Sequence, residues 1–207
     1  MDSVIPQLAY SDANVDSGGL FIIIAGQDFF TSGLIEVGGN VCTVLPGDHT
    51  HTQIRCLLPA GSGATNDVTV NIAGQVSVPK NYAYAPPVID TVTPDHGPTL
   101  GGAVITLAGT SFSTSGAVTI GGLACNPVGS GHQHFQIECE LPEGIGQGLT
   151  IALTVDGQPA TPQPYTFSYD APIVSTISPN HGNTEGSTEV VIFGSNFGPI
   201  GTVVTAT

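Results

Sequence analysis

The sequence has few charged side chains and almost no basic ones. Only 9% of its 207 residues are charged, and the two cations, Arg55 and Lys80, face 16 acidic residues, which gives a formal net charge of −14. Nucleic-acid binding needs clustered Lys and Arg to neutralise phosphates. Anionic membrane surfaces attract the same residues. The composition therefore argues against both as partners.

Long apolar runs and tryptophan are also missing. No stretch of 18 apolar residues occurs, so no segment is predicted to span a membrane as a helix. Carbohydrate-binding faces are usually built from Trp or Tyr, and the chain has no Trp. The start, Met1 to Val4, has neither the basic nor the apolar region of a signal peptide. We expect that a signal has been removed or that the sequence begins inside a longer chain.

The sequence contains a repeated unit, which occurs twice in full and a third time in part. Each unit has a Gly three residues before a Phe, and the first two units carry two cysteines in the same register, at an offset of 83 residues. The phased residues are Gly26, Gly109 and Gly194, and then Cys42, Cys56, Cys125 and Cys139. A period this long indicates tandem domains rather than a solenoid of short repeats. The pattern predicts two complete modules, residues 1–85 and 86–171, and one partial module, residues 172–207.

The local pattern of each module is that of short strands. Apolar runs are brief, rich in β-branched residues and bounded by Gly, Pro, Asn or Asp, and several alternate with polar residues at a period of two. No segment shows a helical stripe of useful length. We therefore predict an all-β fold with about seven short strands per module, arranged as a sandwich. The junctions at Ala85–Ile89 and Ala171–Val174 contain proline, which stiffens the backbone and predicts a rod-like array.

The second unit resembles the IPT/TIG module, the immunoglobulin-like domain of plexins and of certain transcription factors. The resemblance rests on the opening Pro87–Pro98, the Gly-Gly of Gly101–Thr106, Gly109 with Phe112, and Val118–Gly122, Cys125, Cys139 and Leu141-Pro142. It implies tandem immunoglobulin-like β-sandwiches. The first unit departs at Leu8–Asn14, which lacks the Ser/Thr-Pro, and the third matches only through Phe197. The resemblance says little about the role, since one fold serves many functions.

The resemblance also places the two cysteines of each module on neighbouring strands. It implies disulfides between Cys42 and Cys56 and between Cys125 and Cys139, which the even count and matched spacing support. Disulfides indicate an oxidising, extracellular or cell-surface setting. The alternative is zinc, because a His-x-His lies between the cysteines of each module, and two thiolates with two imidazoles could form a tetrahedral site. The histidines are His49, His51, His132 and His134. We favour disulfides and predict no bound metal.

Other constellations of polar residues give weaker signals. Glu138 and Glu140 flank Cys139 on one strand, where they are expected to face solvent rather than a cleft like the acid pair of a glycosidase. Asp90, Asp95 and Asp170 fall near module junctions and could bind calcium, but three scattered carboxylates are more often surface charge. We expect no enzymatic activity and no cofactor.

The functional hypothesis is a non-enzymatic extracellular array with a structural or adhesive role. The alternatives are the stalk of a cell-surface receptor or adhesin, and accessory modules of a secreted carbohydrate-active enzyme. The partial third module would leave an apolar face and an open edge uncovered. Either the chain continues beyond Thr207 or other copies of the chain cover that face, in which case a head-to-tail contact would build a fibril. We predict that Val190, Ile192 and Phe193 form this contact, with other surface proteins or glycans as further candidate partners.

Overall fold

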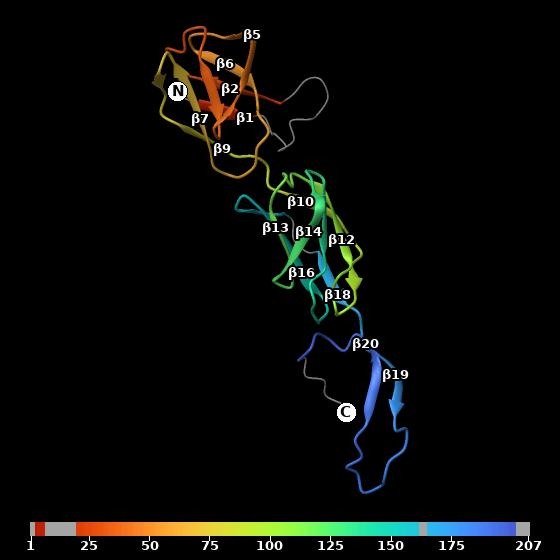
Figure 1. Cartoon of the computed structure of the whole chain (residues 1–207). Coiled ribbons are helices and arrows are strands. Elements are labelled where there is room, and N and C mark those ends of the chain that lie inside the picture. Colours follow the sequence, from red (N-terminus) through yellow and green to blue (C-terminus); the bar gives the residue numbers. More distant parts are fainter. Residues whose placement is uncertain (1–2, 7–19, 162–164, 202–207) are drawn as a thin grey trace.

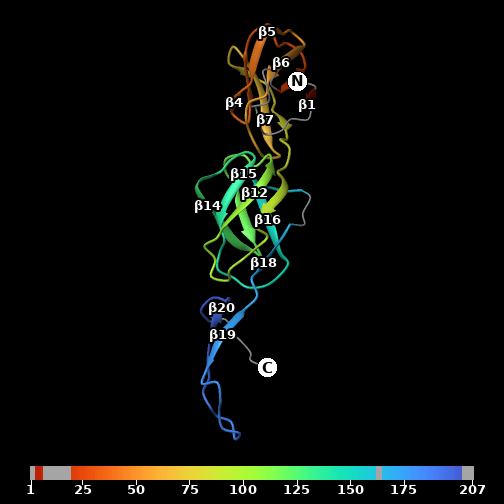
Figure 2. The ribbon, with the colours of Figure 1, turned by 90° about the vertical axis from the view of Figure 1, so that its right-hand side faces the viewer.

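The computed structural model describes the backbone of residues 3–6. It describes both backbone and side chains of residues 20–161 and 165–201. The described residues form two β-sandwiches followed by a β-hairpin, one after the other in a row (Figures 1 and 2). They contain no helix, and so none that is long and apolar enough to cross a membrane. The all-β fold predicted from the short alternating runs is confirmed.

The first module packs one sheet against another. One sheet has the order β1 (Ser3–Pro6), β2 (Phe21–Ala25), β6 (Gln53–Leu57) and β5 (Thr43–His49). The other has the order β4 (Asn40–Val41), β3 (Leu34–Val37), β7 (Asn66–Ile72) and β8 (Gln75–Val76), with β9 (Lys80–Tyr82) also paired to β7. Alternate residues of β2, β3, β6 and β7 are buried between the sheets, as the period of two predicts.

The second module repeats this arrangement. Its strands are β10 (Val88–Thr93), β11 (His96–Gly97), β12 (Val104–Thr110), β13 (Ala117–Ile120), β14 (Leu123–His132), β15 (Gln136–Glu140), β16 (Leu149–Val155), β17 (Gln158–Pro159) and β18 (Thr166–Tyr169). The long strand β14 pairs with β13 at one end and with β15 at the other, which joins the two layers. The module has more strands than the seven expected, because β11 and β17 are two-residue pairings too short to leave a pattern in the sequence.

The third module is described as a hairpin. Strand β19 (Ile173–Ser178) pairs antiparallel with β20 (Val191–Ser195), and its register shifts at Ser175 as that of β10 shifts at Asp90. Val190 was expected inside this strand but lies just before it. The further strand predicted at Val203–Thr205 lies outside the described residues.

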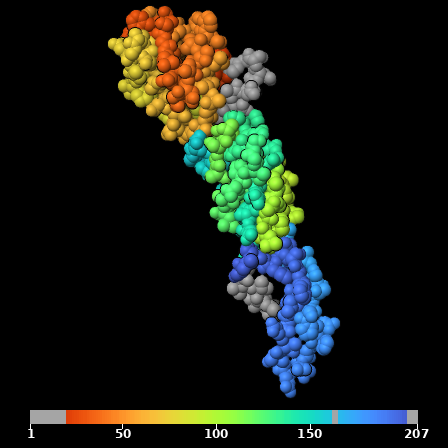
Figure 3. Space-filling view, viewed as in Figure 1, coloured from red at the N-terminus to blue at the C-terminus, as the bar shows by residue number. Residues whose placement is uncertain are grey.

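Each complete module has its own apolar core. In the second module the buried side chains come from both layers and include Phe112, Ile120, Ile137, Ile151 and Phe167, none of which exposes any surface. The first module has a separate core of the same kind. The space-filling view shows the modules as successive bodies of an elongated particle (Figure 3).

Candidate functional site

The cysteines of each complete module form a buried disulfide. Cys42 is bonded to Cys56, with Cα atoms 5.5 Å apart, and Cys125 to Cys139, with Cα atoms 5.3 Å apart. At most 2% of each cysteine is exposed. Both bonds attach the central strand of a sheet, β6 or β15, to the segment that crosses between the layers. In these pairs the sulfurs cannot act as thiolate ligands for a metal.

The histidines between the cysteines have structural partners. The Nε2–H of His49 donates to the carbonyl oxygen of Phe29, and that of His132 to the carbonyl of Phe112, both at 2.9 Å. Each imidazole thus fastens the hairpin between two strands to the turn that follows β2 or β12. Among the described residues, no group of three or more His, Cys, Asp or Glu side chains converges on a metal-sized site. The zinc alternative therefore has no geometric support.

The carboxylates considered for catalysis do not converge, and those considered for calcium form no metal-sized group among the residues that the structure describes. Glu138 accepts a hydrogen bond from the side chain of Gln136 at 2.8 Å, and Glu138 and Glu140 lie on the outer face of β15, since the residues between and before them are buried. Asp170 lies 2.8 Å from Nδ1 of His96 at the far end of the second module. Asp90 lies on β10 at the end nearer the first module, so it cannot share an ion with Asp170.

The junction between the first two modules is joined by polar side chains. The hydroxyl of Ser62 donates to the carboxylate of Asp156, and it also lies 3.3 Å from the hydroxyl of Ser113. The side-chain amide of Gln158 donates to the carbonyl oxygen of Tyr84 at 3.1 Å. Both contacts tie the hairpin of β16 and β17 in the second module to the end of the first module.

The linker itself is held against the second module. The N–H of Thr161 donates to the carbonyl of Pro87 at 2.9 Å, and the hydroxyl of Tyr165 donates to the carbonyl of Asp90 at 2.6 Å. Because proline also fixes the backbone at Pro86 and Pro87, the linker has few backbone torsions that can rotate freely. The stiffening of this junction by proline was predicted from the sequence, whereas the contacts of Ser62, Asp156 and Gln158 were not. Gly74-Gln75 and Gly157-Gln158 occupy equivalent positions in the first two modules. This repeated pair is the sequence signal that could have pointed to Gln158.

The junction between the second and third modules has looser contacts. The N–H of Gly198 lies 3.3 Å from the hydroxyl oxygen of Thr99, and the side-chain amide of Asn196 lies 3.3 Å from the carbonyl of Ala171. A hollow of 240 Å³ remains between the two modules, lined by residues that include Ile145, Tyr169, Asp170 and Pro172. The two junctions are therefore built differently.

Buried tyrosines close the end of each complete module. The hydroxyl of Tyr84 donates to the carbonyl of Pro59, and that of Tyr169 to the carbonyl of Pro142, both at 2.7 Å. Burial, with a smaller effect of the neighbouring Tyr82, raises the pKa of Tyr84 to about 12. Such a phenol stays protonated in any physiological medium, so these tyrosines are structural donors.

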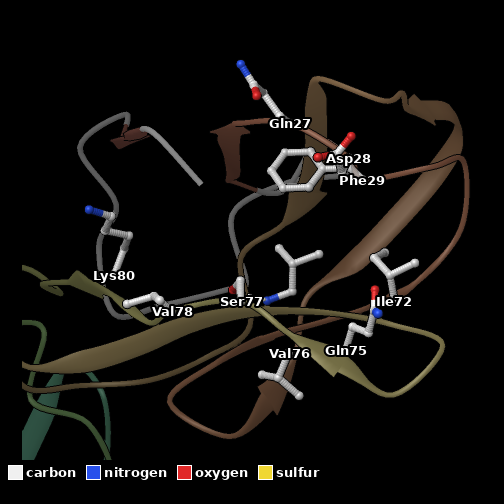
Figure 4. Close-up of a pocket in the computed structure, with 10 residues that line it drawn as sticks. Gln27, Asp28, Phe29, Ile72, Gln75, Val76, Ser77, Val78 and Lys80 are labelled. Atoms are coloured by element: carbon white, nitrogen blue, oxygen red, sulfur yellow. Dashed lines mark hydrogen bonds between the residues drawn. The ribbon is translucent and has the colours of Figure 1, made fainter.

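The first module has a hollow of about 520 Å³, shown in Figure 4. Its lining combines Asp28 and Lys80 with apolar residues such as Phe29 and Ile72. At the equivalent place in the second module, Val88 pairs with Thr110 and Pro87 accepts a hydrogen bond from Thr161. The hollow thus corresponds to a position that backbone occupies in the repeat, and it is not evidence of a ligand site.

A comparison with protein families identifies the repeats. The IPT/TIG domain family matches residues 10–84, 87–169 and 172–207, which together span most of the chain. The chain belongs to the IPT/TIG family. The family predicted from the Gly, Phe and Cys pattern is confirmed, and the tandem immunoglobulin-like sandwich fold with it.

Several characterised proteins resemble these IPT/TIG modules. Human fibrocystin-L is 29% identical over 191 residues, covering 87% of this chain and 4% of the relative. Plexin-2 of Caenorhabditis elegans is 29% identical over 201 residues, covering 89% of this chain and 11% of the relative. The contact site A protein of Dictyostelium discoideum is 33% identical over 105 residues, covering 49% of this chain and 20% of the relative.

Among solved structures, the plexin A4 extracellular region matches 84% of this chain and 16% of its own, with 21% identity and a TM-score of 0.42. The IPT/TIG chain thus spans only a small part of each of these proteins. The buried disulfides and the likeness to plexin-2 and fibrocystin-L indicate an extracellular or cell-surface location.

Proposed function

We propose that the chain is a non-enzymatic extracellular array of IPT/TIG modules, residues 1–85, 86–171 and 172–207, that acts as a stiff structural or adhesive rod. The observation that carries this proposal is the first junction, where the hydrogen bonds Ser62–Asp156 and Gln158–Tyr84 connect the two modules. A stiff rod keeps a fixed distance between the partners that bind at its two ends. The likeness to plexin-2 and fibrocystin-L also supports the neighbouring roles of receptor stalk or surface-binding module, with other surface proteins or glycans as partners.

The absence of enzymatic activity is part of this proposal. It is supported by the positions of the candidate groups, since Glu138 and Glu140 lie on an outer sheet face and the histidines His49 and His132 are tied to backbone carbonyls. An acid pair or a nucleophile with its base needs convergence in a cleft. Such a convergence does not arise from these residues.

We expect that replacing Asp156 and Gln158 with alanine loosens the first junction without unfolding either module. Spin labels at Asp67→Cys and Ser130→Cys would report the distance distribution between the two modules. Wild-type protein should give one narrow distribution, and the double variant one about twice as wide, because both side-chain contacts are lost. Gln75→Ala is the matched control, since Gln75 holds the equivalent position in the first module. A wild-type distribution as broad as that of the double variant would remove the basis for a stiff rod.

A second candidate function, assembly with copies of the same chain, is favoured by the exposed apolar hairpin. Val190 and Ile192 are 47% and 44% exposed, whereas the equivalent residues of the second module, Ile105 and Leu107, are fully buried. Phe193, at 53% exposure, follows Ile192 in β20 and therefore points to the opposite face. A partner that covers the core-side face would contact Val190 and Ile192 but not Phe193.

If copies assemble through this face, we expect the full chain to form elongated particles and a chain ending at Asp170 to remain monomeric. Sedimentation velocity and negative-stain images of both proteins would measure this. The net charge of −14 opposes close contact, so assembly of the full chain should increase as salt screens the repulsion. Equal assembly of the two chains would show that the hairpin is not the joint. A full chain that stays monomeric at every salt concentration would remove self-assembly from the proposed function.

A further inference from the structure

The end of the second module carries a paired histidine and aspartate where the linker to the third module begins. Strand β11 pairs in parallel with β18, so that His96 lies opposite Ser168 and Gly97 opposite Tyr169. Nδ1 of His96 lies 2.8 Å from Oδ1 of Asp170, and the N–H of Asp170 donates to the carbonyl of Gly97 at 2.7 Å. Asp170 is thus fastened to β11 through both its side chain and its backbone.

Asp170 is also the residue from which the third module departs. Ala171 and Pro172 follow it directly, and all three residues line the 240 Å³ hollow between the modules. Among the described residues, the contacts across this junction include the 3.3 Å Thr99–Gly198 contact and the 3.3 Å Asn196–Ala171 contact. Because these contacts are long and the third module leaves the second at Asp170 beside a hollow, a change in how Asp170 is held can reach the third module.

The protonation of His96 sets the strength of the side-chain part of that hold, whereas the backbone bond to Gly97 does not depend on it. Its hydrogen bond to Asp170 and then the Asp170 charge raise the pKa of His96 above its ordinary value of 6.5, and Asp95 on the same segment adds a smaller effect. The carboxylates of Asp170 and Asp95 both favour the imidazolium.

We propose that His96 and Asp170 form a pH-dependent latch that stiffens the second junction in mildly acidic medium and releases it in alkaline medium. The protonated imidazole donates from Nδ1 and attracts the carboxylate. The neutral ring loses the charge, and its Nε2–H tautomer cannot donate from Nδ1 at all. The latch deepens the rod function proposed above and rests on it, since it regulates the bend of the same array.

The direction with pH follows from the raised pKa. A group whose pKa is higher in the folded arrangement contributes its stabilisation fully below the ordinary value, here 6.5, and loses it as pH rises through the raised value. The junction should therefore be stiff at pH 5.5, below the ordinary pKa of 6.5, and loosen as the pH rises above that value.

Distance distributions between spin labels at Ser130→Cys and Thr176→Cys, measured on the full chain from pH 5.5 to pH 8.5, test the latch. We expect a narrow distribution at pH 5.5 that becomes about twice as wide at pH 8.5. His96→Gln and Asp170→Asn should remove the pH dependence. His181→Gln, which alters the equivalent histidine of the third module, should leave it unchanged.

The imidazole titration of His96, followed by NMR, should have the same midpoint as the change in width. A wild-type profile that is flat, or one that persists in His96→Gln, would overturn the latch. The pair Asp67→Cys and Ser130→Cys across the first junction separates this outcome from failure of the rod proposal. Its distribution should stay narrow at every pH, and a broad one would contradict the rod while leaving the latch test readable.

Discussion

Replacing Cys125 and Cys139 together with alanine should lower the melting temperature of the second module by roughly 12–24 °C. The disulfide closes a loop of about 15 residues, which contributes about 3 kcal/mol in the chain-entropy model. For a domain of 60–100 residues, each kcal/mol shifts the melting temperature by about 4–8 °C. Because both cysteines lie in the apolar core with at most 2% exposure, the loss of their packing adds to the entropic effect.

Differential scanning calorimetry of the chain would resolve this effect by module. The equivalent change in the first module, Cys42→Ala with Cys56→Ala, is the matched control. It should lower the melting temperature of the first module and leave that of the second module unchanged. Peptide mapping without reduction should recover two linked pairs, each within one module. Free thiols in the native protein, or zinc bound in a stoichiometric amount, would contradict the disulfide assignment and revive the metal alternative at His49 and His132.

Features that repeat with the module could be predicted from the sequence. The Gly–Phe and Cys–Cys registers recur along the chain, so the modules followed from comparing the chain with itself. The all-β fold followed from the strand pattern, and the family from the resemblance of the second unit to the IPT/TIG module. Strands such as β16 could be located because alternate residues face the core, and that alternation is a property of the strand alone. The fold of each module can therefore be predicted from the residues of that module alone.

The junction contacts could not be predicted in the same way. Ser62 and Asp156 are 94 residues apart in the chain, and they meet only because the end of one module is set against the start of the next. Ser and Asp on loops are also what any solvated surface carries, so neither residue stands out. The latch residues His96 and Asp170, 74 residues apart, share this difficulty. Asp170 was noted as a possible calcium ligand, whereas its partner in the structure is an imidazole.

The glycine that recurs in each module could be recognised from the sequence, but the reason for it is visible only in the structure. Gly26, Gly109 and Gly194 were used only to set the register of the repeat. In the structure, a side chain built at Gly109 would overlap the carbonyl oxygen of Val88 and lie 2.7 Å from the ring of Phe112. The irregular pairing of β10 with β12 brings that carbonyl over the glycine. The same overlap, with Ile173 and Phe197, occurs at Gly194.

We therefore expect Gly109→Ala to destabilise the second module by about 3 kcal/mol or more, the upper part of the range for overpacking. The obstacle is a backbone carbonyl rather than a flexible side chain, so relief would require β10 to leave its register on β12. The ring of Phe112 cannot move aside either, because it is fully buried in the core. The free energy of unfolding from urea titration, followed by a signal specific to the second module, would measure the loss.

Gly102→Asn provides the comparison for Gly109→Ala. Gly102 has a φ of +79°, and an added side chain there meets nothing within 4 Å. Asn tolerates the left-handed backbone better than other residues with a side chain, so this change should cost less than about 1 kcal/mol. If Gly109→Ala proved as stable as Gly102→Asn, the glycine would not be required by the close approach of β10. The recurrence of glycine at this position in all three modules would then need another cause.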